Sequence, residues 1–191
     1  RRQRQMCIRD RLYTDAMRAT AANESVPFVD LYGPTRVLMS VPDAIPLTIN
    51  GIHLSDYGYW AVSSILFDGF FESDKAIGDQ PWQINVDAKG KTSDAKGLSL
   101  SGLSSNRREI SFQATEKASP SLPPPTKRDL PAALNARRDT MVIKNLQAGK
   151  YVLIIDGERV ASATHNELAE GVAIDSSPAH RDCLLYTSPS P

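Results

Sequence analysis

The feature that most constrains this chain is a change in the spacing of its apolar residues near residue 74. Before that point they recur at helical intervals, and after it they alternate with polar residues in short runs. We therefore expect a helix-rich α/β region followed by a β-rich region. The 191 residues are enough for one ordinary domain or two small ones.

The first region begins with a helix followed by a buried strand. Apolar spacing predicts the end of a helix over Leu12 to Asn23. The apolar run Val26 to Tyr32 predicts a buried strand that ends at Gly33-Pro34, and Thr35 to Ile49 is expected to be irregular. Helix and buried strand in this order are typical of a parallel α/β sheet.

A second helix is predicted from about Asp56 to Phe71, with Ser55 as its N-cap. Its apolar residues lie on two faces, so we expect it to pack on the predicted strand through Tyr59, Trp60 or Leu66. Tyr59 and Trp60 could instead line a sugar-binding cleft, but packing explains them more simply.

The region from residue 75 to residue 181 is predicted to be β-rich and antiparallel. Turn signals such as Lys89-Gly90 and Asp156-Gly157 separate the strands, and the second of these predicts a hairpin. Five prolines between Ser119 and Pro131 indicate a semi-rigid linker or surface loop. A short helix is expected over His165 to Glu170, closed by Gly171. The candidate strands are Trp82 to Asp87, Ile110 to Ala114, Thr140 to Ile143 and Tyr151 to Ile155.

The two ends of the chain resemble translated sequencing adapter rather than natural protein. RRQRQMCIRD, residues 1–10, matches one reading frame of a common transposase-end adapter, and CLLYTSPSP, residues 183–191, matches the same adapter in the opposite orientation. Arg11 and Asp182 lie at the junctions. We therefore interpret residues 1–11 and 182–191 as artefact and expect both to make few long-range contacts.

Removing these ends changes the composition that bears on function. Both cysteines lie in them, so a disulfide between Cys7 and Cys183 is not expected. Taking away five arginines and two aspartates leaves 17 basic and 20 acidic residues. No dense basic run remains, which argues against a nucleic-acid partner. No apolar stretch approaches the roughly 20 residues that a membrane span needs.

The residues that carry chemistry are Asn50-Gly51-Ile52-His53-Leu54, followed by Gly58-Tyr59 in the predicted helix. This block resembles the last signature block of the SGNH/GDSL-type ester hydrolases, in which Asp-x-x-His places a catalytic histidine before the final helix. The resemblance implies a flavodoxin-like α/β sandwich and a serine nucleophile activated by histidine. Residues 12–74 would be the C-terminal remnant of that sandwich.

On this interpretation His53 is the general base, since imidazole titrates near neutral pH and can reach a serine on another loop. Asn50 stands where the family has Asp. Asn50 could orient the ring without a charge, the enzyme could work as a Ser-His pair, or another carboxylate such as Asp30 could serve. Asp30 at the end of a strand more simply caps the following loop.

The resemblance also has gaps. Residues 12–181 contain no Gly-Asp-Ser-Leu-like block and no glycine or Gly-x-Asn-Asp block, so the nucleophile and oxyanion hole would belong to a preceding part of a longer parent protein. Residues 75–181 resemble a β-rich, sandwich-like extension of some bacterial GDSL-type proteins, most clearly over Leu146 to Gly157. His165 and His180 lack a motif and are expected at the surface.

The sequence thus predicts an ester hydrolase acting through an acyl-enzyme on a small-molecule or carbohydrate ester. We expect no cofactor and no metal, because no carboxylate or cysteine lies at ligand spacing from a histidine. The alternative is a non-catalytic module that binds glycans or proteins. The acyl group, the oligomeric state and the cellular location stay open, although an extracytoplasmic parent is compatible with the resemblance.

Overall fold

The structure, a computed structural model, describes residues 2–71 and 81–187, and only the backbone of residues 2–8 and 183–187. The chain divides into two compact units, one of residues 1–78 with 124–131 and one of residues 79–123 with 132–191. The boundary predicted at residue 74 lies outside the described residues. Among the described helices, none is both long and apolar enough to cross a membrane.

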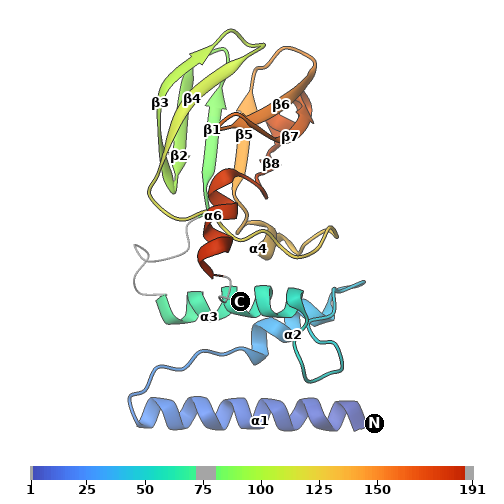
Figure 1. Ribbon diagram of the computed structural model, residues 1–191. Coiled ribbons are helices and arrows are strands. Elements are labelled where there is room, and N and C mark those ends of the chain that lie inside the picture. The colour runs from blue at the N-terminus through green and yellow to red at the C-terminus, as the bar shows by residue number, and fades with distance from the viewer. Residues whose placement is uncertain (1, 72–80, 188–191) are drawn as a thin grey trace. The chain divides into compact units, whose positions relative to one another are not determined.

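The first unit contains three helices, α1 (Arg2–Asn23), α2 (Tyr32–Ser40) and α3 (Asp56–Phe71), drawn in blue to green in Figure 1. The helix ending at Asn23 and the one beginning at Asp56 are as predicted. Ser55 caps α3, because its Oγ accepts a hydrogen bond from the backbone N–H of Gly58 at 3.0 Å.

The buried strand predicted over Val26 to Tyr32 is wrong. This segment forms no strand, and the isolated bridge Thr48–Leu54 is the unit's only β-pairing within the described residues. A parallel strand needs backbone groups of a neighbouring strand, and none is offered here. The segment packs on α3 all the same, since a Cβ at Gly69 would lie 2.4 Å from Val29 Cγ1. Of the three residues named as alternatives for this contact, Tyr59, Trp60 and Leu66, Tyr59 is 64% exposed.

Helix α2 occupies part of the stretch predicted to be irregular. Gly33-Pro34, predicted to end a strand, lies in the first turn of this helix. Backbone N–H groups in a first turn have no partner within the helix, so the N–H that proline lacks is not missed there. The carboxylate of Asp30 accepts a hydrogen bond from the N–H of Gly33 at 3.1 Å. Asp30 therefore has the capping role that was the simpler interpretation.

The second unit contains the β-rich region (Figure 1). One sheet has the order β2-β1-β5-β8, and β3-β4 and β6-β7 form two-stranded sheets. The β-elements are β1 (Gln83–Asp87), β2 (Thr92–Lys96), β3 (Leu98–Ser105), β4 (Ile110–Glu116), β5 (Thr140–Lys144), β6 (Lys150–Ile155), β7 (Glu158–Thr164) and β8 (Val172–Ala173). The helices are α4 (Ala132–Asn135), α5 (His165–Glu170) and α6 (Pro178–Thr187).

The four predicted strands are confirmed as β1, β4, β5 and β6, but the purely antiparallel arrangement is wrong. β1 and β5 pair in parallel, with Ile84 opposite Met141. The chain between them holds three strands and the proline-rich segment, which is ample length for a parallel crossover. The predicted hairpin turns at Asp156-Gly157, both with positive φ as a type I′ turn requires.

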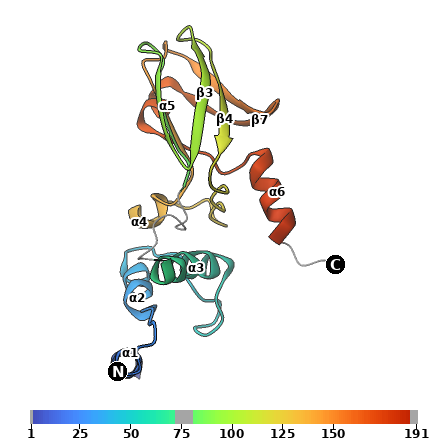
Figure 2. The ribbon, with the colours of Figure 1, turned by 90° about the vertical axis from the view of Figure 1, so that its left-hand side faces the viewer.

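The short helix predicted at His165 is also confirmed as α5, with a complete capping box. Thr164 Oγ1 accepts from the backbone N–H of Glu167, and the Glu167 carboxylate accepts from the backbone N–H of Thr164 at 2.7 Å. The hydrogen bonds from the backbone and side chain of Thr164 lower the pKa of Glu167. Helix α5 contacts β5 and β7, and Figure 2 shows it in the second unit together with β3, β4 and β7.

The end segments predicted to be adapter are helical along their described backbone, in α1 and α6. Arg9, Asp10 and Asp182 are exposed, and no described residue of either segment lies in a strand. The adapter origin itself stays a prediction.

The core of the second unit forms where alternate residues of β1 and β5 face inward: Trp82, Ile84, Val86, Met141 and Ile143 are all buried. A charged residue lies beside them. Asp139 is 1% exposed, and its carboxylate accepts hydrogen bonds from the backbone N–H groups of Trp82 at 2.7 Å and Ser121 at 2.9 Å. It therefore joins the start of β1, the proline-rich segment and β5.

His180, expected at the surface, is 2% exposed and is a second correction in this unit. Its Nε2 lies 3.2 Å from Asp139 Oδ2, and its ring meets Trp82 edge-on at 5.8 Å. Ser177 and Pro178 occupy the N-cap and first positions of α6, which turns the histidine inward.

We predict that Asp139→Asn lowers the free energy of unfolding by about 1–3 kcal/mol. The new amide nitrogen cannot accept, so one buried backbone N–H loses its partner. Chemical denaturation followed by Trp82 fluorescence measures the change. Asp175→Asn is the matched control, because Asp175 pairs with Arg138 at the surface, where such pairs contribute roughly 0–1 kcal/mol. Equal losses in the two variants would contradict the role assigned to Asp139.

Candidate functional site

The predicted signature block forms a short closed loop before α3. The Ile49 N–H donates to the carbonyl of His53 at 2.8 Å, and the Ser55 N–H donates to the carbonyl of Leu47 at 2.9 Å. At the turn, Gly51 has a φ of +83°, a conformation that favours glycine. The loop therefore returns on itself and brings Asn50 back to His53.

This loop is fastened to the start of α3. Leu47 is 2% exposed, and a Cβ at Gly58 would lie 1.9 Å from its carbonyl oxygen, so only glycine permits this approach. Ser55 adds a second attachment, since its Oγ donates to the carbonyl of Pro46 at 2.9 Å. The glycine of the Gly58-Tyr59 pair thus has a physical function, which is close packing of loop on helix.

Asn50 and His53 contact each other directly. Asn50 Oδ1 accepts hydrogen bonds from the backbone N–H groups of Ile52 at 3.2 Å and His53 at 3.0 Å. The imidazole Nδ1 lies 3.0 Å from Asn50 Nδ2 and 3.2 Å from Asn50 Oδ1. The side chain of Asn50 therefore both closes the turn and positions the imidazole ring of His53.

The other ring nitrogen of His53 faces away from these contacts. Within the described part of the chain, Nε2 makes no hydrogen bond, and the residue is exposed. Its neighbours Ile49 and Ile52 are 77% and 81% exposed. The loop thus presents one histidine nitrogen between two exposed apolar side chains, an arrangement able to exchange a proton with another group.

Tyr57 and Trp60 are explained by packing. Tyr57 is 6% exposed, and its ring stacks on that of Trp60 with the centroids 6.0 Å apart. Burial raises the pKa of the Tyr57 hydroxyl, and the charge of Arg128 partly opposes this. Tyr59 is exposed, so the packing predicted for it is not observed.

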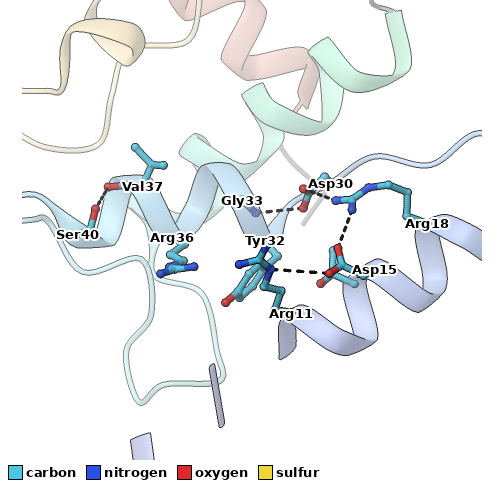
Figure 3. A pocket seen from close by; sticks show the side chains of 10 residues that line it. Arg11, Asp15, Arg18, Asp30, Tyr32, Gly33, Arg36, Val37 and Ser40 are labelled. Atoms are coloured by element: carbon cyan, nitrogen blue, oxygen red, sulfur yellow. Dashed lines mark hydrogen bonds and ion pairs between the residues drawn. The ribbon is translucent and has the colours of Figure 1, made fainter. Parts of the chain in front are cut away.

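Asp30, the carboxylate considered as a partner for His53, is engaged elsewhere. It accepts from Arg18 at 2.7 Å and from the Gly33 N–H. Figure 3 shows it at the edge of an open pocket of about 510 Å³ between α1 and α2. Arg18 also pairs with Asp15 there, and Arg11 lies at the predicted adapter junction, so we do not identify this pocket as the site.

The second unit holds a Ser-His-Asp set that the sequence did not suggest. Ser177 Oγ lies 2.6 Å from His180 Nδ1, and Nε2 faces Asp139. The order differs from a catalytic triad, in which serine contacts Nε2 and aspartate contacts Nδ1. All three residues are at most 2% exposed, and Ser177 also accepts from the backbone N–H of His180. The set anchors α6 and leaves no access for a substrate.

No group of three histidine, cysteine or acidic residues arranged to hold a metal ion occurs among the residues that the structure describes. The candidate site consists chiefly of His53 and Asn50. The geometry brings these two predicted residues together and leaves Asp30, His165 and His180 outside the site.

Comparison with known proteins finds a solved structure of similar fold but no matching family. No family model matches the chain, and no curated protein does. A solved structure described as a gut microbial diltiazem-metabolizing enzyme is similar, with a TM-score of 0.64 and 18% sequence identity. The match covers 90% of this chain, more than either unit alone contains, and 43% of the other. It shows a shared mixed α/β fold over both units, and the chain spans less than half the length of this neighbour.

We predict that Gly58→Ala destabilises the first unit by about 3 kcal/mol or more, the upper part of the overpacking range. In a helix with no obstruction, Gly→Ala stabilises the helix by roughly 0.5–1 kcal/mol. The sign of the change in stability therefore tests whether the loop contacts Gly58. Hydrogen exchange of peptides from residues 45–71 measures it. Ser63→Ala, at an exposed position of the same helix, should leave the exchange almost unchanged. Normal protection in Gly58→Ala would show that the loop does not rest on α3.

Proposed function

We propose that this chain is the C-terminal part of a Ser-His-type ester hydrolase in which His53 is the general base and then the general acid. The observation that carries the proposal is the exposed His53, held at Nδ1 by Asn50 and free at Nε2. A base in this position fits the SGNH-like order of loop, histidine and helix, which Gly58 keeps together.

In this mechanism a serine hydroxyl attacks the ester carbonyl while His53 Nε2 takes its proton. The tetrahedral intermediate collapses, and the imidazolium returns that proton to the departing alkoxide, which leaves as an alcohol. Water then attacks the acyl-enzyme, again losing a proton to Nε2, and the acid is released as the serine recovers its hydrogen. The serine and the oxyanion donors belong to the preceding part of the parent protein.

The exposed apolar surface of the first unit supports this view. Val37 and Met39 of α2 are 64% and 56% exposed, in addition to Ile49 and Ile52 beside the histidine. Val26, in the segment that precedes α2, is also exposed, at 57%. The rest of an α/β sandwich would cover these residues and bring its serine to His53.

The substrate class is a small-molecule or carbohydrate ester. The solved neighbour's description, which names diltiazem, makes that compound a reasonable test substrate beside acetylated sugars. The second unit would be an accessory part of the same enzyme, as in the extension that residues 146–157 resemble.

A second candidate is a non-catalytic module that binds glycans or proteins. The observation that favours it is Asn50, which stands where the resembled family has a carboxylate. An amide cannot stabilise an imidazolium by charge, so a protein without catalytic demand would tolerate it better. The two candidates make opposite predictions for the parent protein.

We predict that His53→Ala lowers kcat of the parent protein on an acyl ester by several orders of magnitude with little change in stability. General base catalysis contributes about 10²- to 10⁴-fold, and the serine is a weak nucleophile without it. Initial rates on p-nitrophenyl acetate, an acetylated sugar and diltiazem measure the effect. The present chain alone should be inactive on all three.

His165→Ala is the matched control, because His165 belongs to the second unit and its Nδ1 accepts a long hydrogen bond from the Gly149 N–H, at 3.4 Å. Its rates should equal those of the parent. If His53→Ala is as active as the parent, the catalytic proposal fails and the binding module remains. A Gly-Asp-Ser-like block found upstream in the same genomic sequence would favour the enzyme.

A further inference from the structure

Asn50 is held in one orientation by the loop that it closes. Its Oδ1 accepts from two backbone N–H groups, of Ile52 and His53. Reversing the amide would turn Nδ2, a donor, toward these two donors and leave both unpaired. The loop backbone therefore fixes which atom of the amide is oxygen and which is nitrogen.

With the amide fixed in this way, Nδ2 is the atom at 3.0 Å from His53 Nδ1, and it can only donate. Oδ1 lies farther from Nδ1, at 3.2 Å, and already receives two N–H groups. The stronger contact thus requires an unprotonated Nδ1, and in a neutral ring the hydrogen then resides on Nε2.

We propose that Asn50 is a positioning residue that holds neutral His53 in the tautomer protonated at Nε2. The consequence for catalysis rests on the proposed function, because a base that takes the serine proton at Nε2 needs the opposite tautomer. An aspartate at this position would keep the two backbone hydrogen bonds through one oxygen and accept Nδ1–H through the other. Asn50 therefore lowers the share of His53 that is ready to act as a base.

Nitrogen-15 correlation spectra of the 191-residue chain test the tautomer directly. The spectra are recorded at alkaline pH, because the tautomer is defined for the neutral ring alone. We expect the Nδ1 resonance of His53 at the position of an unprotonated ring nitrogen and that of Nε2 at the position of a protonated one. His53→Gln identifies the signals by removing them.

In Asn50→Asp the two resonances should exchange character, with Nδ1 now protonated. Asn106→Asp is the matched control, because Asn106 Oδ1 likewise accepts from two backbone N–H groups, of Arg108 and Glu109, and has no histidine beside it. That variant should leave His53 unchanged. A wild-type Nδ1 that is already protonated, or an Asn50→Asp spectrum identical to wild type, would overturn the proposal.

Kinetics of the parent protein then separate this inference from the proposed function. If both hold, Asn50→Asp raises kcat, by up to the roughly 10⁴-fold that the reverse exchange costs a serine protease. If His53→Ala shows no loss, the esterase proposal fails while the tautomer assignment stands on its spectra. If the spectra contradict the tautomer, His53 can still be the base, with Asn50 accepting at Oδ1.

Discussion

The close approach of the Leu47 carbonyl to Gly58 is the contact on which the candidate site depends. A hairpin-like loop of nine residues has no sheet to rest on in this unit, so its position comes from the helix beneath it. Because Gly58 has no Cβ, the loop backbone lies against the first turn of α3, and Ser55 ties both sides. His53 is positioned by these contacts although the residue itself is exposed, which is the requirement for a group that must meet a partner from outside the loop.

In the second unit, a side chain satisfies backbone groups that the sheet leaves buried. Its sheet joins strands that are far apart in the sequence, and parallel pairing of β1 with β5 leaves their first backbone groups in the interior. Asp139 supplies the acceptors there, one residue before β5, and the Thr140 N–H donates to the carbonyl of Trp82 at 2.7 Å. The buried carboxylate is tolerated because it accepts two backbone hydrogen bonds, and His180 Nε2 lies 3.2 Å from its Oδ2.

Much of this fold could be predicted from local patterns. The helix at Asp56, the capped helix at His165 and the Asp156-Gly157 hairpin each follow from signals within a few residues, and each is present as expected. The failures involve partners distant in sequence. Val26 to Tyr32 has the composition of a strand but no strand beside it, and β2, with the polar sequence Thr92-Ser-Asp-Ala-Lys96, pairs because β1 offers an edge.

The candidate site shows the same division. The family resemblance made Asn50 one of three alternatives for the partner of His53, and the structure places these two side chains in contact. It could not predict the direction of that contact, because the orientation of an amide depends on which backbone N–H groups face it. The buried position of His180 was equally hidden, as it depends on Asp139, more than forty residues earlier.

Whether His53 Nε2 carries a hydrogen distinguishes the two functions proposed for this chain. As a proton acceptor, Nε2 suits a serine hydroxyl and ester hydrolysis, and as a proton donor it suits the oxygen atoms of a bound glycan or carboxylate. The loop geometry serves both, since neither the closed turn nor the contact with Gly58 depends on the ring proton. The difference between aspartate and asparagine at position 50 is one atom, yet it decides whether Nδ1 faces an acceptor or a donor. A loop of this geometry can therefore keep its shape while its histidine changes from a base to a hydrogen-bond donor.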